Sequence, residues 1–175
     1  MFKYFIPDYL FDGIFDIPED FFEKLDIRAV IFDIDNTLVK DGYPFPEEKT
    51  KEYIYSLRKK GIAVAIASNN NEERVRKFVE SFDCDIAYSF KSGKPKKSSL
   101  QTVLNTFRQQ PSHVALVGDQ ILTDVIAANL NGIISVYVKP IDTTIENAFF
   151  VLKRILERPF LGIYRLKNKK KGKCK

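Results

Sequence analysis

Short apolar runs recur along most of the chain, each bounded by polar or turn-forming residues. Apolar runs of this length, rich in β-branched residues, predict strands that are buried on both faces of a sheet. Five such runs can be recognised, at residues 28–34, 62–67, 85–90, 113–117 and 133–138.

Segments with helical periodicity separate these runs. Residues 46–61 carry the signals of a complete helix, with Pro46 at the first helical position and Gly61 at the C-terminal stop. Asn70 or Asn71 can cap the next helix, whose apolar positions follow the i, i+3, i+4, i+7 spacing: Val75, Phe78, Val79 and Phe82. Similar spacing predicts helices near 100–107, about 121–130 and 145–156.

Strands that alternate with helices predict an α/β fold, a three-layer Rossmann-like parallel sheet of about five strands with helices on both faces. The 175 residues suit a single domain over 1–175, with a core of about 26–158, an aromatic N-terminal segment 1–25 and a basic tail 165–175. In such folds ligands bind beyond the carboxyl ends of the strands.

Composition favours a globular protein in a reducing compartment. Hydrophobic residues make up 45% and charged residues 29% of the chain, and no uncharged apolar run approaches the ~18 residues of a membrane span. The N-terminus lacks the layout of a secretory signal. Cys84 and Cys174 form neither a metal motif nor a disulfide framework, so we expect a cytoplasmic location.

The net charge of +5 belongs to the C-terminal tail. Residues 165–175 hold seven Lys or Arg and no acid, so the rest of the chain has a net charge of −2 (5 minus 7). This tail is either a solvated, disordered end or a segment attracted to an anionic surface, lipid headgroups or RNA. It lacks the interleaved aromatic residues that stack on bases, so it gives no strong nucleic-acid signal.

Two carboxylates follow the first predicted strand. Asp33 and Asp35 are one residue apart, and such a pair repels itself unless a positive charge lies between its members. A divalent cation with oxygen ligands is the simplest candidate. The alternative is a loop in which the aspartates cap backbone amides.

The second and third predicted strands end in groups suited to phosphate. Ser68 is followed by Asn69 and the start of a helix, where a hydroxyl and free amides can cradle phosphate or merely cap the helix. Lys94 lies between Gly93 and Pro95 in "GKP". It either neutralises a phosphate near the strand ends or belongs to a solvated basic loop.

The fourth predicted strand ends in "GDQILTD", which contributes Asp119 and Asp124. Asp124 can also be explained as an acid in the first turn of a helix, which the helix dipole favours. Taken together, however, four successive strand ends offer a divalent metal site, a phosphate site and a candidate nucleophile.

In this order, "DIDNT", the serine of "ASNN", "GKP" and "GDQILTD" resemble the four motifs of the haloacid dehalogenase (HAD) superfamily of phosphotransferases. The resemblance spans residues 28–138. The variants "DNTLV", "SNNNE" and "GDQILTD", together with "FIPD" near the start, are similar to the YqeG-type HAD IIIA phosphatases. That group resembles the phosphatidylglycerophosphate phosphatases of mitochondria and plastids.

The resemblance implies roles for the acids. Asp33 would be the nucleophile that forms an aspartyl-phosphate, and Asp35 the general acid and then the base. Mg²⁺ would be held by Asp33, the backbone carbonyl of Asp35, and Asp119. Asp124 would orient these ligands through water or Lys94.

The resemblance also implies that Ser68, the amide of Asn69, and Lys94 hold the phosphate oxygens. Neither the interval 37–68 nor the interval 68–94 has room for the cap domain that many HAD enzymes insert. An uncapped site suits a phosphate displayed on a large partner such as a lipid headgroup, a protein or a nucleic-acid end.

The N-terminal segment has apolar residues at helical spacing, but Pro7 interrupts the pattern. The segment either covers the core or inserts shallowly at a membrane interface. We therefore expect a Mg²⁺-dependent phosphatase of a lipid phosphate, phosphatidylglycerophosphate by resemblance, cytoplasmic and peripheral at the inner face of the membrane. A phosphoprotein or nucleotide phosphatase, or a non-catalytic RNA-associated protein, is the alternative. The sequence gives no oligomeric state.

Overall fold

The computed structural model of the chain describes residues 2–144 and 148–170. Its central feature is a six-stranded sheet in which every neighbouring pair is parallel, in the order β1-β6-β5-β2-β3-β4. The strands are β1 (Tyr9–Phe11), β2 (Ala29–Phe32), β3 (Ala63–Ala67), β4 (Ala87–Ser89), β5 (Val114–Gly118) and β6 (Ile134–Val138). This arrangement confirms the predicted α/β class.

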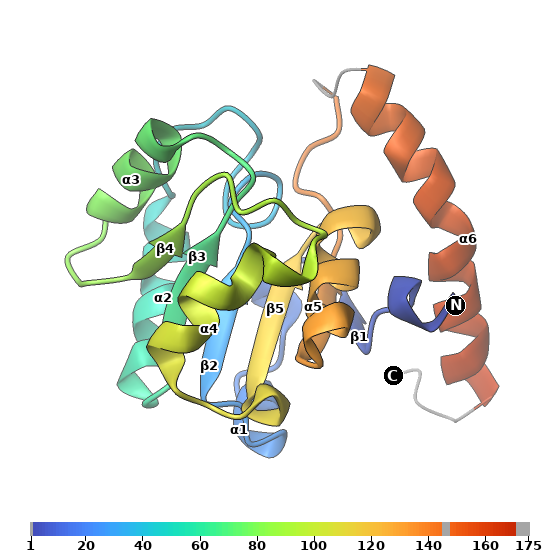
Figure 1. Ribbon diagram of the computed structural model, residues 1–175, viewed down its shortest axis with the longest axis horizontal. Coiled ribbons are helices and arrows are strands. Elements are labelled where there is room, and N and C mark those ends of the chain that lie inside the picture. Colours follow the sequence, from blue (N-terminus) through green and yellow to red (C-terminus); the bar gives the residue numbers. More distant parts are fainter. Residues whose placement is uncertain (1, 145–147, 171–175) are drawn as a thin grey trace.

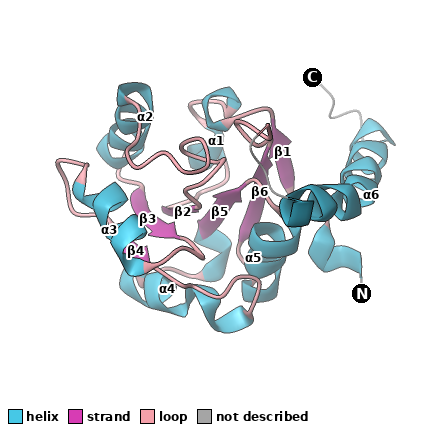
Figure 2. Ribbon diagram, turned by 90° about the horizontal axis from the view of Figure 1, so that it is seen from above, coloured by secondary structure: helices cyan, strands magenta, loops and turns pink. Residues whose placement is uncertain are grey.

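Helices cover both faces of the sheet (Figures 1 and 2). On one face lie α1 (Phe21–Lys24), α2 (Glu48–Lys59) and α3 (Glu72–Glu80); on the other lie α4 (Gln101–Phe107) and α5 (Ile126–Asn131). The central strand β2 has apolar side chains on both faces of the sheet, so helices must pack on both. Val30 and Phe32 belong to the core on the α2 side and Ala29 and Ile31 to the core on the α5 side, as the alternation of a strand requires.

The five predicted runs all form strands, and the N-terminal segment adds a sixth, β1, to the sheet. Strand β1 pairs in parallel with β6, placing Tyr9 opposite Val136. The apparent helical spacing is not realised beyond a single 3₁₀ turn, η1 (Phe2–Phe5), which ends before Pro7. Another 3₁₀ turn, η2 (Ile14–Asp16), leads to α1. Tyr9 packs on the main core, and Phe5 and Leu10 pack on the cluster of Ile121 and Tyr137, as the interpretation that this segment covers the core expects.

The helix boundaries require two further corrections. Helix α2 begins at Glu48, so Pro46 precedes the helix instead of occupying its first position. The basic tail 165–175 was expected to be either a solvated, disordered end or a segment attracted to an anionic surface. Helix α6 (Ala148–Lys170) continues into it, so residues 165–170 are helical and not disordered, whereas 171–175 lie outside the described residues, as does Ile145. The prediction that an asparagine caps α3 is confirmed for Asn71, whose side chain accepts a hydrogen bond from the amide of Arg74.

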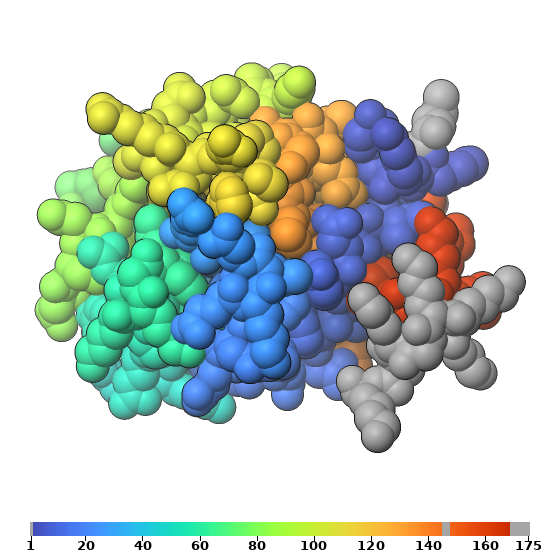
Figure 3. All heavy atoms as spheres, turned by 90° about the horizontal axis from the view of Figure 1, so that it is seen from below, coloured from blue at the N-terminus to red at the C-terminus, as the bar shows by residue number. Residues whose placement is uncertain are grey.

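Helix α6 runs along the β1 edge of the sheet, where it lies beside the N-terminal segment (Figures 1 and 3). The ring of Phe160 stacks on Phe5 with 4.8 Å between centroids, and Leu161 packs on the same small cluster as Ile121 and Tyr137. Within the described ranges, no helix is both long enough and apolar enough to cross a membrane.

Candidate active site

The residues predicted from strand ends come together at the carboxyl edge of the sheet. Asp33 directly follows β2, Ser68 follows β3 and Asp119 follows β5, while Lys94 lies in the loop after β4. Asp33, Ser68 and Lys94 line a cavity of about 280 Å³, together with Asp35 and Asn69. Parallel strands bring these separate segments to one place because all their carboxyl ends share one edge.

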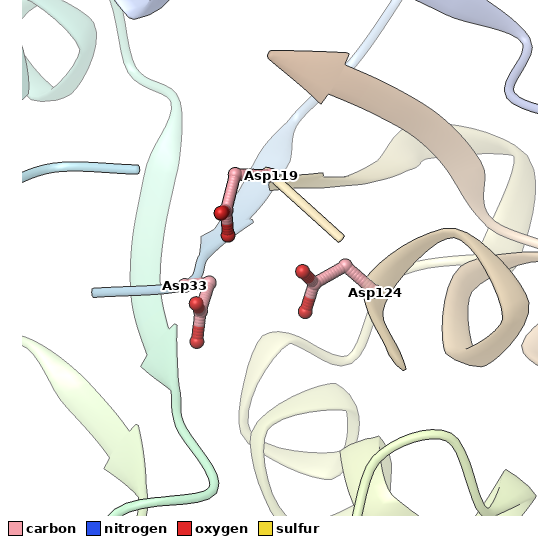
Figure 4. Close-up of side chains that lie close together, drawn as sticks. All are labelled: Asp33, Asp119 and Asp124. Carbon is pink, nitrogen blue, oxygen red and sulfur yellow. The ribbon is translucent and has the colours of Figure 1, made fainter. Parts of the chain in front are cut away.

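Three carboxylates lie close together at this edge of the sheet, and one of them, Asp33, also lines the cavity. Asp33, Asp119 and Asp124 each offer an oxygen, and these oxygens all lie within 4.8 Å of one another (Figure 4). All three residues are buried. Acids this close and this well shielded from water repel one another strongly, so the cluster calls for positive charge. The oxygen donors fit a hard divalent cation.

Lys94 supplies one such charge and is itself buried. Its Nζ donates to Oδ1 of Asp33 at 2.8 Å, to Oδ1 of Asp124 at 2.7 Å and to the carbonyl of Ala67 at 2.7 Å. Burial alone would lower the pKa of Lys94, but the carboxylates of Asp124 and Asp33 outweigh it and raise the pKa above its ordinary value. The prediction that Lys94 lies near the strand ends is therefore confirmed, and the solvated-loop alternative is wrong for this residue.

Burial and the neighbouring charges also shift the pKa values of Asp33 and Asp119. Burial raises the pKa of Asp33 to about 7, although Lys94 opposes the rise and Asp124 adds to it. Burial also raises the pKa of Asp119 well above its ordinary value, against the opposing charge of Arg154. Perturbed carboxylates gathered at a cavity are characteristic of a functional site.

Asp124 can lie close to Asp33 and Lys94 because of the backbone that precedes it. A β-carbon on Gly118 would overlap the side chain of Asp124, so only glycine fits at this position. The following residues form a π-helical turn, η5 (Ile121–Val125), and Oδ2 of Asp124 accepts a hydrogen bond from the amide of Gln120 at 3.1 Å. Such turns are frequent at functional sites. Asp124 is thereby fixed toward Asp33 and Lys94.

The segment after β3 lines the cavity and also positions the loop that carries Lys94. Ser68 is buried, and its Oγ accepts the amide of Asn70 at 3.2 Å. The side-chain oxygen of Asn69 accepts the amides of Gly93 and Lys94 at 3.0 and 2.9 Å, and its nitrogen donates to the carbonyl of Lys94 at 3.0 Å. The sequence pointed only to the backbone amide of Asn69, whereas its side chain positions Lys94.

Asp35 lines the cavity but lies apart from the three-carboxylate cluster. Its Oδ1 is 3.0 Å from Nη2 of Arg74, and its Oδ2 accepts a hydrogen bond from the side chain of Asn70. Arg74 also donates to the carbonyl of Pro44 at 3.0 Å, which connects the loop before α2 to the site. Arg74 was missed because an arginine within the first turns of a helix looks like a solvated residue.

Helix α6 also contributes residues that the sequence did not reveal. Arg154 donates to the carboxylate and the backbone carbonyl of Asp119, and Oε1 of the buried Glu157 accepts the amide of Leu122 at 2.9 Å. Lys153 and Phe150 line the cavity. No local signal identifies these residues, because their contacts depend on where α6 packs.

Aspartates follow neighbouring parallel strands, a serine and a lysine lie beside them, and no cap is inserted within residues 37–94. These features are those of a phosphatase of the HAD type. The comparisons agree with this class. Residues 2–141 match the family described as mitochondrial PGP phosphatase. The chain is 30% identical over 166 residues to "Probable phosphatase YqeG" of Bacillus subtilis (strain 168), a match that covers 95% of each chain. The chain therefore belongs to the mitochondrial PGP phosphatase family and is of the YqeG type.

Two solved structures share the fold at low sequence identity. The cobalt-bound form of deoxy-D-mannose-octulosonate 8-phosphate phosphatase from Haemophilus influenzae aligns with a TM-score of 0.53 and 17% identity, covering 66% of this chain and 70% of that one. An uncharacterized protein from Listeria monocytogenes serotype 4b aligns with a TM-score of 0.52 and 21% identity, covering 69% and 85%. At these identities the similarity supports the fold alone.

Proposed function

We propose that this phosphatase is Mg²⁺-dependent, acts through an aspartyl-phosphate on Asp33 and hydrolyses a lipid phosphate, phosphatidylglycerophosphate. One observation carries the proposal: Lys94 joins Asp33 to Asp124 within a three-carboxylate cluster at an uncapped cavity. The cluster supplies metal ligands, the lysine supplies charge for phosphate, and the open cavity admits a large substrate.

Mg²⁺ would be held by Asp33, the backbone carbonyl of Asp35, and Asp119. Asp124 would hold these ligands in place through its ion pair with Lys94. The carboxylate oxygens fit this ion because Mg²⁺ prefers hard oxygen donors. When bound, the ion would offset the negative charge of the acids and of the phosphate.

The protein's own groups would then carry out two displacements. A carboxylate oxygen of Asp33 bonds to phosphorus while the ester P–O bond breaks, and Asp35 gives its proton to the leaving oxygen. Water next bonds to phosphorus and passes a proton to Asp35, while the Asp33–phosphorus bond breaks and inorganic phosphate leaves. Ser68, the amide of Asn69, and Lys94 bind the phosphoryl oxygens and offset their charge in both steps.

The lipid substrate is supported by the family and by the missing cap. Residues 37–68 contain a loop, α2 and β3, and residues 68–94 contain α3, β4 and loops, so neither interval closes over the cavity. A lipid headgroup exposed at a membrane surface can enter such a site, which favours a peripheral position at the inner face of the membrane in the cytoplasm.

A substrate panel tests the proposal. The purified chain is incubated with phosphatidylglycerophosphate in detergent micelles, phosphatidic acid, a nucleoside monophosphate and a phosphopeptide, each with Mg²⁺ or EDTA, and Asp33→Asn serves as the control. We expect phosphate release to be highest for phosphatidylglycerophosphate and to require Mg²⁺. Preference for the phosphopeptide or the nucleotide would refute the lipid assignment, and release in EDTA would refute the metal.

A further inference from the structure

The side of α6 that faces away from the sheet is apolar and exposed. Its surface is formed by five residues that are each between 36% and 65% exposed: Leu152, Ile155, Leu156, Ile163 and Leu166. We call this set the α6 outer face. Scattered exposed apolar residues are ordinary on a protein surface, but a continuous stripe along one helix marks an interaction site.

The periodicity of the helix separates this face from the side that contacts the domain. At 3.6 residues per turn the five residues fall on one side of α6, opposite Lys153, Arg154 and Glu157. The inner side packs against the domain through Phe160 and Leu161, so the outer face is not needed to bury the helix. Helix α6 therefore contacts the domain with a side that mixes charged and apolar residues, whereas its outer side is apolar and exposed.

The charged residues of α6 indicate which kind of partner fits its outer face. Arg158 and Arg165 border the face on one side and Lys167 on the other, and all three are exposed. The single acid of the helix, Glu157, lies buried on the inner side. An apolar stripe with a wholly basic border matches an anionic lipid surface, in which apolar side chains enter the acyl boundary and cations meet the headgroups.

We propose that the α6 outer face docks this protein on an anionic membrane and so presents the active-site cavity to lipid phosphates. A second copy of the chain fits the face less well, because a symmetric contact would bring two basic borders together without an acid between them. The inference rests on the proposed lipid substrate and adds the surface that would hold the protein at the membrane containing that lipid.

The position of the cavity supports this orientation. Phe150 and Lys153 line the cavity, and they belong to the same turns of α6 as Leu152 and Ile155 of the outer face. The N-terminal part of the helix therefore forms a wall of the active site on one side and the docking surface on the other. A lipid headgroup at the edge of the docked helix therefore lies one helix diameter, ~10–12 Å, from the cavity.

Co-sedimentation of the full chain with vesicles tests this surface. Vesicles of phosphatidylcholine with and without phosphatidylglycerol are compared at low and high salt, for the wild type and for Leu152→Gln with Leu156→Gln. We expect the double variant to lower the partition coefficient on phosphatidylglycerol vesicles about tenfold or more, since two leucines lose their insertion. Arg158→Gln with Arg165→Gln should weaken binding mainly at low salt.

Phe15→Gln with Phe90→Gln is the matched control, because these residues are also exposed aromatic or apolar positions but lie outside α6. The control should bind vesicles as the wild type does, and the thermal midpoints of all variants show whether they fold. Equal binding by the Leu152/Leu156 variant, or no binding by the wild type, overturns the docking proposal.

The oligomeric state decides the main alternative. A wild-type dimer in sedimentation velocity that becomes monomeric in the Leu152/Leu156 variant would assign the face to a second copy instead of a membrane. Because vesicle binding is measured without turnover, a failure of the lipid-substrate proposal in the panel above leaves this result independent. Conversely, hydrolysis of phosphatidylglycerophosphate in micelles without binding to vesicles would refute only the docking proposal.

Discussion

The Nζ of Lys94 lies 2.8 Å from Oδ1 of Asp33, so the proposed nucleophile is in direct contact with a buried cation. Burial and the charge of Asp124 both favour the protonated form of Asp33, and Lys94 opposes them. A protonated carboxyl cannot attack phosphorus. Lys94 therefore has a role even before phosphate binds, because its charge helps Asp33 to remain ionised.

Asp33→Asn should remove turnover of an aryl phosphate while the protein stays folded, because the amide cannot attack phosphorus and Lys94 keeps Asp124 as a partner. Asp35→Asn should lower kcat by about 10²–10⁴-fold, the usual contribution of general acid–base catalysis. Both rates are measured by release of the aryl alcohol, and circular dichroism checks the fold.

A beryllofluoride soak identifies the nucleophile directly. The adduct should form on Asp33 in the wild type and should be absent from Asp33→Asn. An adduct on Asp119 or Asp124 in the crystal would mean that the nucleophile has been misassigned.

Lys94→Met should destabilise the fold by about 3–5 kcal/mol at pH 8, because it leaves buried carboxylates without their partner. The loss should shrink as pH falls and the acids take up protons. Urea unfolding at both pH values measures it. Combining Lys94→Met with Asp33→Asn and Asp124→Asn should restore most of the lost stability, and a triple variant as unstable as the single one would show that packing, not charge, is the cause.

Much of the site could be predicted because its residues follow consecutive strands. Asp33, Ser68, Lys94 and Asp119 each come directly after an apolar run or shortly beyond it, and in a parallel sheet all such ends share an edge. The order of the motifs along the chain is therefore enough to predict that these side chains meet.

The parts that could not be predicted depend on contacts distant in sequence. Strand β1 is only three residues long and owes its existence to pairing with β6, more than 120 positions away, so local spacing pointed to a helix instead. Arg154 reaches Asp119 only because α6 packs along the β1 edge. Arg74 has the same limitation, since its partner Asp35 lies 39 positions earlier.

Mg²⁺ should stabilise the wild type against heat and should have little effect on Asp119→Asn. A ligand that binds only the folded state at 100 times its Kd adds about 2.7 kcal/mol to the free energy of unfolding. The measurement is the thermal midpoint with MgCl₂ or with EDTA. An equal shift in Asp119→Asn would indicate that the ion binds elsewhere, and Asp12→Asn, an exposed acid outside the site, is the control.

Glu157→Gln should change how stability depends on pH. Burial raises the pKa of Glu157 above its ordinary value of 4.5, so between that value and its folded pKa the folded state binds more protons than the unfolded state. This acid therefore contributes stability at low pH that is lost as pH rises past 4.5. The glutamine keeps an acceptor for the amide of Leu122 but does not titrate. Urea unfolding from pH 4 to 8 should show the wild type losing stability relative to the variant as pH increases, and parallel curves would contradict the assignment.

Lys153→Gln should separate substrates that carry one anionic group from those that carry two. Lys153 lines the cavity, and its Nζ lies 3.5 Å from the side-chain oxygen of Gln120, within reach of a substrate that extends toward α6. Phosphatidylglycerophosphate has a phosphodiester besides its terminal phosphate, whereas an aryl phosphate has nothing for Lys153 to hold beyond the reacting group. Charge-assisted hydrogen bonds contribute about 1.5–3 kcal/mol, so KM for the lipid in micelles should rise roughly tenfold or more. KM for the aryl phosphate should rise much less, and kcat for both should change little.

Lys59→Gln, on α2 and outside the cavity lining, is the control and should leave both KM values as they are. An equal rise for both substrates would show that Lys153 attracts phosphate in general and does not recognise the second group.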